Sequence, residues 1–323
     1  METSWRELLG KMIRDPHEQQ RLLEVLNVSS MTLRRWVNGE TNPRPQNLRS
    51  LLSAIPQQRK QMISLLVTEF PFIAESSDLN DEDFLMSAEF YAQVINTYVS
   101  VSQYLRPVTI SNLLLQHMLT HIDPYRDGLL IYIAQCVPPA QGQKVRSVRI
   151  VMGRGTAPWS TYVEHHPLFM GMESMVGYAI TSGHLTVIRN RVEGLHSFAS
   201  DQVDNVESAV AIPIVLANQT AGGVYLASTQ SDHFTQKHLA LIQKYIELMC
   251  LGFEKEDFYL LSDIALDIMP TRDQQLPFLV TFQQRVTQQM VSAAHEKHIL
   301  TRPQAERIVW QQLEEELLQI SVK

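Results

Sequence analysis

Residues 209–229 read AVAIPIVLANQTAGGVYLAST, and this stretch decides how the middle of the chain folds. It contains two apolar runs, rich in Val, Ile and Leu, which are joined by a polar turn that bears glycine. Short apolar runs separated in this way are typical of a β-hairpin. We therefore expect two paired strands here, and the elements around them set the fold class.

Shorter strand-like runs precede the hairpin, at Leu129–Val137, Lys144–Met152 and Leu185–Arg189. Gly, Pro or Asn bounds each of these runs, as expected for strands. Apolar residues recur at helical spacing over 84–103, 108–122 and 235–253. Residues 84–254 are therefore predicted to form an α+β domain, with a central antiparallel sheet covered by helices.

The regions that flank this domain have a different pattern. Residues 1–70 hold short helical runs without an obvious strand, which predicts a small all-α domain. The segment 71–83, PFIAESSDLNDED, combines Pro, Ser, Asn and acids and is predicted to be a linker. Residues 255–323 are rich in Gln, Glu and Leu without a convincing strand, so a helical C-terminal segment is expected. The predicted fold class is thus multidomain.

Charge is distributed unevenly along the 323 residues. Residues 1–66 carry 10 Lys and Arg against 6 Asp and Glu, a net charge of +4, whereas the remainder carries 17 against 28, a net charge of −11. Because the phosphate backbone of DNA attracts local positive charge, a basic head on an acidic body is the pattern expected of a DNA-binding regulator. The alternative is ordinary scatter in charge.

The sequence also indicates the compartment. The N-terminal METSWRELLGKMIRD carries charges throughout, unlike a secretory signal, and no segment approaches ~18 uncharged apolar residues. The two cysteines, Cys136 and Cys250, lie too far apart in sequence to indicate a disulfide framework or a thiolate metal site. We expect a soluble, cytoplasmic protein that does not bind membranes.

Residues 17–55 have the spacing that a helix-turn-helix requires. Leu22 and Leu26 lie on one apolar face, Asn27 permits a tight turn, and Ser29 or Ser30 is suited to cap the next helix. In that next helix Leu33 and Trp36 lie three residues apart and are expected to face inward. The outward positions are then Ser30, Met31, Thr32, Arg34 and Arg35, side chains whose chemistry suits base edges and phosphates.

The stretch VSSMTLRRWVNGETNPRPQNLRSLL resembles the Cro/repressor-type (XRE-like) helix-turn-helix family, including the W-x-N-G helix end and the following Pro. The resemblance implies double-stranded DNA as the partner and a homodimer that reads two half-sites. It also implies the contacts of individual side chains: Ser30, Met31, Thr32 and Arg35 with bases, and Arg34 and Arg44 with phosphates. The alternative is a degenerate helical bundle that binds protein.

Residues 172–190, MESMVGYAITSGHLTVIRN, resemble the middle of a GAF domain, with Gly177 and Gly183 at matching positions. The hairpin and the stretch FTQKHLALIQKYIELMCLGFE resemble the last hairpin and closing helix of that family. The resemblance spans about residues 84–254. It implies a sheet with helices on its back and a pocket for a small molecule between the sheet and its covering segments.

The pocket cover is expected within residues 153–178. This segment is rich in aromatic and Met side chains, which suit an apolar ligand: Trp159, Tyr162, His165, His166, Phe169, Met172, Met175 and Tyr178. The alternative is that these side chains simply fill a core, in a domain that serves for dimerisation. The segment has no Cys for covalent bilin attachment and lacks the signature of cyclic-nucleotide-binding members, so the cofactor or ligand stays open.

Catalytic and metal-binding motifs are not evident. The chain has no GxSxG, GxxxxGK[ST] or HExxH motif. The pairs His117/His121 and His295/His298 have helical spacing but lack a third ligand nearby, so no metal site is expected. A rival hypothesis is an enzyme built on the pocket, with His165, His166 and Glu173 as acid–base residues.

The leading hypothesis is a transcriptional regulator, not an enzyme, in which the GAF-like domain senses a small molecule or mediates dimerisation. Helices at 84–103 and 235–253 are expected to form the dimer seam. The alternative is a protein-interaction or scaffold module, with a degenerate helix-turn-helix and an unliganded GAF-like dimeriser.

Overall fold

The computed structural model describes residues 4–55, 58–66, 69–70, 85–163, 168–191, 198, 204–296 and 298–321. The chain divides into two compact units, Met1–Phe84 and Leu85–Lys323. The predicted linker, 71–83, lies outside the described residues. Each unit has its own apolar core and is considered by itself below.

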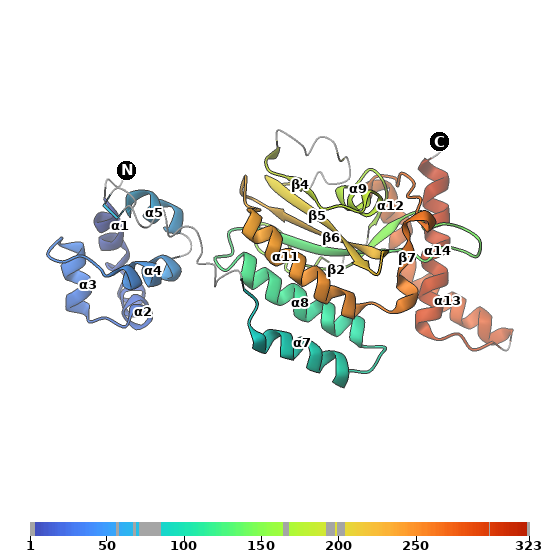
Figure 1. Cartoon of the computed structure of the whole chain (residues 1–323), viewed down its shortest axis with the longest axis horizontal. Helices are drawn as coiled ribbons and strands as arrows, with labels where there is room; N and C mark the ends of the chain where they lie inside the picture. The colour runs from blue at the N-terminus through green and yellow to red at the C-terminus, as the bar shows by residue number, and fades with distance from the viewer. Residues whose placement is uncertain are drawn as a thin grey trace. The chain divides into compact units, whose positions relative to one another are not determined.

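The described part of the first unit is built of short helices (Figure 1). These are α1 (Trp5–Met12), α2 (Pro16–Leu26), α3 (Ser30–Val37), α4 (Pro45–Ala54) and α5 (Arg59–Leu66). Apolar side chains from all of them form one buried cluster, in which Trp5, Leu22, Leu33 and Leu48 are almost fully covered. The amphipathic spacing of these side chains explains why such short helices are stable only when packed together.

Side-chain caps define the starts of the first three helices. Ser4, Asp15 and Ser29 each accept a hydrogen bond from a backbone N–H in the first turn of the following helix. Between α2 and α3, Asn27 adopts the left-handed conformation (φ 49°, ψ 47°), which reverses the chain. The turn predicted at Asn27 is therefore confirmed, and Ser29 is the cap.

The two ends of the first unit are tied together by Glu69. Its carboxylate accepts hydrogen bonds from Trp5 Nε1 (2.7 Å) and from both Nη atoms of Arg6 (2.5 Å each). The Arg6 guanidinium holds the pKa of Glu69 below its usual range. Arg6 thus serves the fold of this unit.

The second unit is built around an antiparallel sheet (Figure 1). Its strands are β1 (Leu129–Cys136), β2 (Val148–Gly155), β3 (Phe169–Met170), β4 (Thr186–Ile188), β5 (Ser208–Leu216), β6 (Gln219–Ser228) and β7 (Tyr259–Leu260). Within the described residues the order is β3-β2-β1-β6-β5-β4, and β7 pairs with the start of β6. The predicted hairpin is confirmed as β5 and β6, which pair directly around Ala217 and Asn218.

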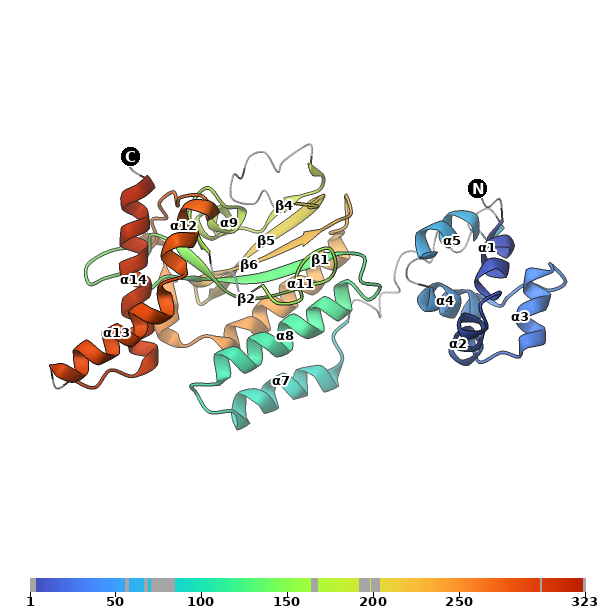
Figure 2. The same ribbon diagram turned by 180° about the vertical axis from the view of Figure 1, so that it is seen from behind.

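Helices cover both faces of this sheet (Figures 1 and 2). On one face lie α8 (Arg106–Ile122) and α11 (Gln236–Met249), with α7 (Ala88–Ser100) packed on α8, and on the other face lies α9 (Met175–Ser182). The core under α9 includes the stacked rings of Tyr132 and Tyr225. The prediction of an α+β domain with a central antiparallel sheet is confirmed.

Two predicted boundaries differ from those in the structure. The strand expected at Lys144–Met152 is β2, Val148–Gly155, because Val145 and Arg146 pair instead with the distant segment 263–267. The helix expected to continue to Phe253 ends at Met249 and continues as a 3-10 turn, Cys250–Gly252.

The C-terminal region packs against the rest of the second unit and contributes a strand, contrary to the expectation of helix alone. After β7 come α12 (Arg272–Leu279), α13 (Phe282–His295) and α14 (Arg302–Ser321). Side chains of these helices bury Val137 and Phe169 in a shared apolar cluster that includes Trp310. Short strands such as β7 carry too little local pattern to be predicted, because distant partners stabilise them.

The same region holds a buried acid. Glu314 of α14 is 3% exposed, and its carboxylate accepts a hydrogen bond from the fully buried hydroxyl of Ser147. Arg146 lies 3.6 Å from the other carboxylate oxygen and also pairs with Glu315. Burial raises the pKa of Glu314 to about 7.

None of the described helices combines the length and the apolar composition required to cross a bilayer.

Candidate nucleic-acid interface

Helix α3 is anchored from behind by two apolar side chains. Leu33 is fully buried and Trp36 is 3% exposed, so both face the core of the first unit as predicted. The helix is amphipathic because these residues lie three positions apart on one face. Its opposite face is consequently available to solvent.

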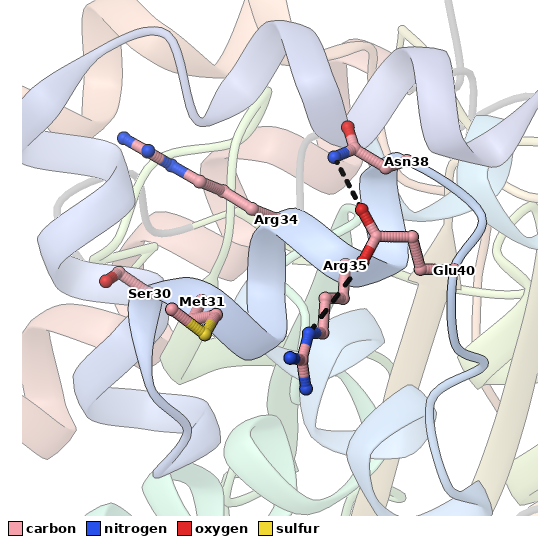
Figure 3. Close-up of a pocket in the computed structure, with 6 residues that line it drawn as sticks. All are labelled: Ser30, Met31, Arg34, Arg35, Asn38 and Glu40. Atoms are coloured by element: carbon pink, nitrogen blue, oxygen red, sulfur yellow. Dashed lines mark hydrogen bonds and ion pairs between the residues drawn. The ribbon is translucent and has the colours of Figure 1, made fainter.

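That opposite face forms a shallow concave surface (Figure 3). We call it the α3 surface and define it by the side chains that line it: Ser30, Met31, Arg34, Arg35, Asn38 and Glu40. Four of these were predicted from helical periodicity as DNA-contacting positions. The structure brings those four together on one side of the domain.

The two arginines of the α3 surface point in different directions (Figure 3). Arg34 and Arg35 are both exposed, and neighbouring positions on a helix project about 100° apart. Met31 is 63% exposed and lies beside Ser30 (Figure 3). An exposed pair of diverging arginines can reach both phosphates and base edges, whereas a thioether can contact a thymine methyl group.

Two predicted contact residues do not line the α3 surface. Thr32 is half-buried, and its hydroxyl lies 2.9 Å from the Ser29 hydroxyl, so it takes part in the helix cap. Arg44 is exposed at the start of α4, where it occupies the N-cap position without a side-chain cap hydrogen bond. Arg44 therefore lies outside the α3 surface.

Sequence reasoning missed Asn38 and Glu40. Asn38 Nδ2 donates a hydrogen bond to Glu40 Oε1 (3.2 Å), and Glu40 Oε2 lies 3.8 Å from Arg35 Nε. Both residues follow the last turn of α3 in the stretch RWVNGE. The Asn-Gly pair, which marks a helix end, was the signal that the chain turns back over Arg35 at this point.

The described residues among those predicted to line a ligand pocket lie in several different surroundings. Phe169 packs on Trp310 in the C-terminal cluster, with ring centroids 5.6 Å apart, whereas Met175 lies in the core under α9. Met172 (38%), Tyr162 (48%) and Tyr178 (46%) are exposed. Trp159 is half-buried at the edge of the α9 core, and His165 and His166 lie outside the described residues.

Glu173, a residue of the rival enzyme hypothesis, is held by the backbone. One carboxylate oxygen accepts the N–H of Gly171 (2.7 Å) and the other accepts the N–H of Met269 (3.0 Å). These bonds join the start of α9 to the segment that follows β7. Glu173 therefore has a structural role that occupies both of its oxygens.

The histidine pair of α8 also contributes to packing. The Nδ1 atoms of His117 and His121 lie 2.5 Å and 2.8 Å from the hydroxyl of Tyr245 on α11, and Phe90 stacks on the His117 ring. Burial lowers the pKa of His117. Both cysteines are free thiols, and among the residues that the structure describes no group of three or more His, Cys, Asp or Glu side chains could hold a metal ion.

Solved structures similar to this one include GAF domains. The GAF domain of a phosphoenolpyruvate-protein phosphotransferase from Acinetobacter aligns with a TM-score of 0.38 at 12% identity, over 52% of this chain and 93% of that chain. The GAF domain of the corresponding enzyme from Coxiella burnetii aligns with a TM-score of 0.38 at 12% identity, over 54% of this chain and 94% of that chain. A type II free methionine-R-sulfoxide reductase from Thermoplasma acidophilum aligns with a TM-score of 0.35 at 12% identity, over 48% of this chain and 98% of that chain.

No protein-family model matches the chain, and no curated protein matches it. The structural alignments each cover about half of this chain, and no ligand or activity follows from similarity at this level.

Proposed function

We propose that this chain is a cytoplasmic, sequence-specific DNA-binding transcriptional regulator. In this proposal α2 and α3 form a helix-turn-helix, α3 enters the major groove, and the second unit is a GAF-like domain that senses a small molecule or mediates dimerisation. The chain binds and does not catalyse. The sequence resemblances to the two families support the assignment of each unit.

The observation that carries the DNA-binding proposal is the composition of the α3 surface. Arg34 and Arg35 point in different directions from α3 (Figure 3). On the other face of this helix, Leu33 and Trp36 are buried in the core of the first unit. A short helix fixed in this way fits the major groove, where arginine recognises guanine and also contacts phosphates. The net charge of +4 over residues 1–66 provides the long-range attraction.

The pairing of two such heads requires a second copy, and the outer face of α7 fits that role. Ile95 (56%) and Val99 (75%) are exposed on α7, followed by Tyr104 (89%), Leu105 (62%) and Val108 (59%). Glu89 is the single charged residue within Ala88–Ser100. Because a two-fold interface places the same surface against itself, an uncharged apolar face avoids repulsion between the two copies.

The other half of the predicted seam has a different environment. Among the described residues of α11, no large apolar side chain is exposed, because Leu241, Ile242 and Tyr245 face α8 and the sheet. We therefore place the proposed seam on the outer face of α7 and on Tyr104, Leu105 and Val108, and not on α11.

The experiment that tests the proposal is fluorescence-anisotropy binding of the full chain to randomised duplex DNA at two salt concentrations, followed by selection and sequencing of the bound pool. Salt-dependent binding and an enriched palindrome are expected, since counterion release accompanies phosphate contacts. Absence of binding at low salt would refute the proposal and favour the protein-interaction module.

A further inference from the structure

The way in which α3 ends suggests a role for Glu40. The N–H of Gly39 donates to the carbonyl of Trp36 (3.2 Å), and the N–H of Glu40 donates to the carbonyl of Arg35 (2.9 Å). These two bonds define a Schellman motif. Gly39 has a φ of +74°, the left-handed conformation that the motif needs. The backbone of Glu40 is thereby fixed beside the last turn of α3.

An ion pair takes the place of the apolar contact that often accompanies this motif. Glu40 Oε2 lies 3.8 Å from Arg35 Nε, and Glu40 Oε1 accepts a hydrogen bond of 3.2 Å from Asn38 Nδ2. Each carboxylate oxygen therefore has its own partner, and both partners belong to the end of the same helix (Figure 3).

A carboxylate is unfavourable on a surface that approaches DNA, because it repels phosphates. Here it lies at the Nε edge of the Arg35 guanidinium, and the two Nη groups point away from it (Figure 3). Two parallel N–H donors at the end of an arginine match the O6 and N7 acceptors of guanine. Restricting the guanidinium in advance also lowers the entropy lost on binding.

We infer that Glu40 is a positioning residue that directs the Nη groups of Arg35 toward a guanine in the major groove. This inference rests on the proposed function. Glu40 lowers the affinity of the protein for every DNA because its carboxylate repels phosphates. This loss of affinity is smallest for a DNA that places a guanine opposite Arg35. Selectivity is a difference between affinities, so a residue that weakens general binding more than specific binding increases it.

The test compares the full-length wild type with Glu40→Gln, Arg35→Ala and the double variant. The probes are the operator obtained by selection and the same operator with each G·C pair replaced in turn by A·T. Glu40→Gln should bind random duplex about 2- to 5-fold more tightly at low salt, because one negative charge is removed. Its discrimination between G·C and A·T at the base pair that Arg35 contacts should also fall about 3- to 10-fold.

A role through Arg35 makes a further demand. In the Arg35→Ala background, Glu40→Gln should change discrimination at no pair, because the group that it positions is gone. Asn38→Ala, which removes the other partner of the carboxylate, should lower discrimination at the same pair. Glu7→Gln, an equal charge change at an exposed position of α1, serves as the control and should leave discrimination unchanged.

The outcomes separate the two proposals. Three results would overturn the role of Glu40 and leave the proposed DNA recognition intact. These are unchanged discrimination in Glu40→Gln, an equal loss of discrimination in the Arg35→Ala background, and an operator without a guanine at the base pair that Arg35 contacts. Absence of salt-dependent binding by the wild type overturns the proposed function itself.

Discussion

The side-chain amide of Gln275 pairs with the main chain of Phe169. The N–H of Phe169 donates to Gln275 Oε1 (2.9 Å), and Gln275 Nε2 donates to the carbonyl of Phe169 (2.8 Å) and to that of Pro270 (2.8 Å). Phe169 belongs to β3 at one edge of the sheet. Gln275, 1% exposed, therefore satisfies backbone groups that a neighbouring strand would otherwise pair.

Replacing this glutamine should destabilise the second unit. Gln275→Ala leaves buried groups of Phe169 without their partner, and we expect a loss of about 2–3 kcal/mol in the free energy of unfolding. Urea-induced unfolding of the full chain, followed by hydrogen exchange at β3, measures it. Gln288→Ala, at an exposed position of α13, should change stability by less than about 0.5 kcal/mol. Equal effects of the two variants would contradict the assigned role.

Arg35 and Arg44 should differ in their effect on DNA binding. Arg35→Ala is expected to weaken operator binding and relax selectivity by about 1–3 kcal/mol, because a bidentate base contact is lost. Arg44→Ala is expected to weaken binding to all sequences alike and to reduce the salt dependence by about one counterion. Anisotropy titrations on operator and random duplex across a salt series measure both effects. Normal binding by both variants would remove α3 and α4 from the interface.

The ion pair of Glu69 should make the first unit sensitive to acid. The pKa of Glu69 is lowered by the hydrogen bonds from Arg6, so its contribution to stability is present above the unfolded value of about 4.5 and is lost as the pH falls through the lower folded value. Because the pair is partly exposed, Glu69→Gln should cost only about 0.5–1 kcal/mol at pH 7. Thermal unfolding at pH 7 and pH 3 tests this. Glu24→Gln, at an exposed position of α2, should behave like the wild type.

Glu314 should have the opposite pH dependence. Burial raises the pKa of Glu314 from 4.5 in the unfolded chain to about 7 in the folded protein. Between these two pH values, the folded protein therefore retains a proton that the unfolded chain has released. Stability from this group is therefore complete below about pH 4.5 and is lost as the pH rises toward 7. Glu314→Gln should unfold at a higher temperature than the wild type at pH 8 and should differ less at pH 5. A variant that is destabilised equally at both pH values would contradict this.

The outer face of α7 should control oligomeric state. Val99→Glu would place a carboxylate in each half of the proposed seam, which we expect to weaken self-association roughly 30- to 150-fold, or about 2–3 kcal/mol. Light scattering coupled to size exclusion gives the mass. Val280→Glu, a change at a position that is 77% exposed next to α12, should leave the mass unchanged. A wild-type monomer at all concentrations would exclude the seam.

Local patterns in the sequence predicted the elements that depend on local interactions. The hairpin of β5 and β6 lies within one residue of its expected ends, since two apolar runs joined by a polar turn are sufficient to define it. β3 and β7 are two residues long and exist because distant segments pair with them. The start of β2 moved because Val145 pairs with residues 263–265, a contact that no local window contains.

In the candidate site too, the sequence predicted the positions that local geometry decides and missed those that depend on other segments. The periodicity of α3 indicated the outward positions Ser30, Met31, Arg34 and Arg35 because helix geometry alone decides them. Glu40 was missed because its place depends on the turn after the helix. Phe169 was assigned to a pocket because aromatic content does not indicate which core a side chain enters, and its partner Trp310 lies far along the chain.

The crossing of the C-terminal region over the sheet edge has a consequence for synthesis of the protein. The carbonyl of Asp267 accepts the N–H of Met172 (2.9 Å), and a Cβ atom on Gly171 would lie 1.7 Å from that oxygen, so position 171 has no room for a side chain. While the residues after 254 are still inside the ribosome, Val137 and Phe169 lack the C-terminal side chains that cover them in the folded protein. The first unit can form its own core during translation, whereas the second unit completes its core only after α14 has been made.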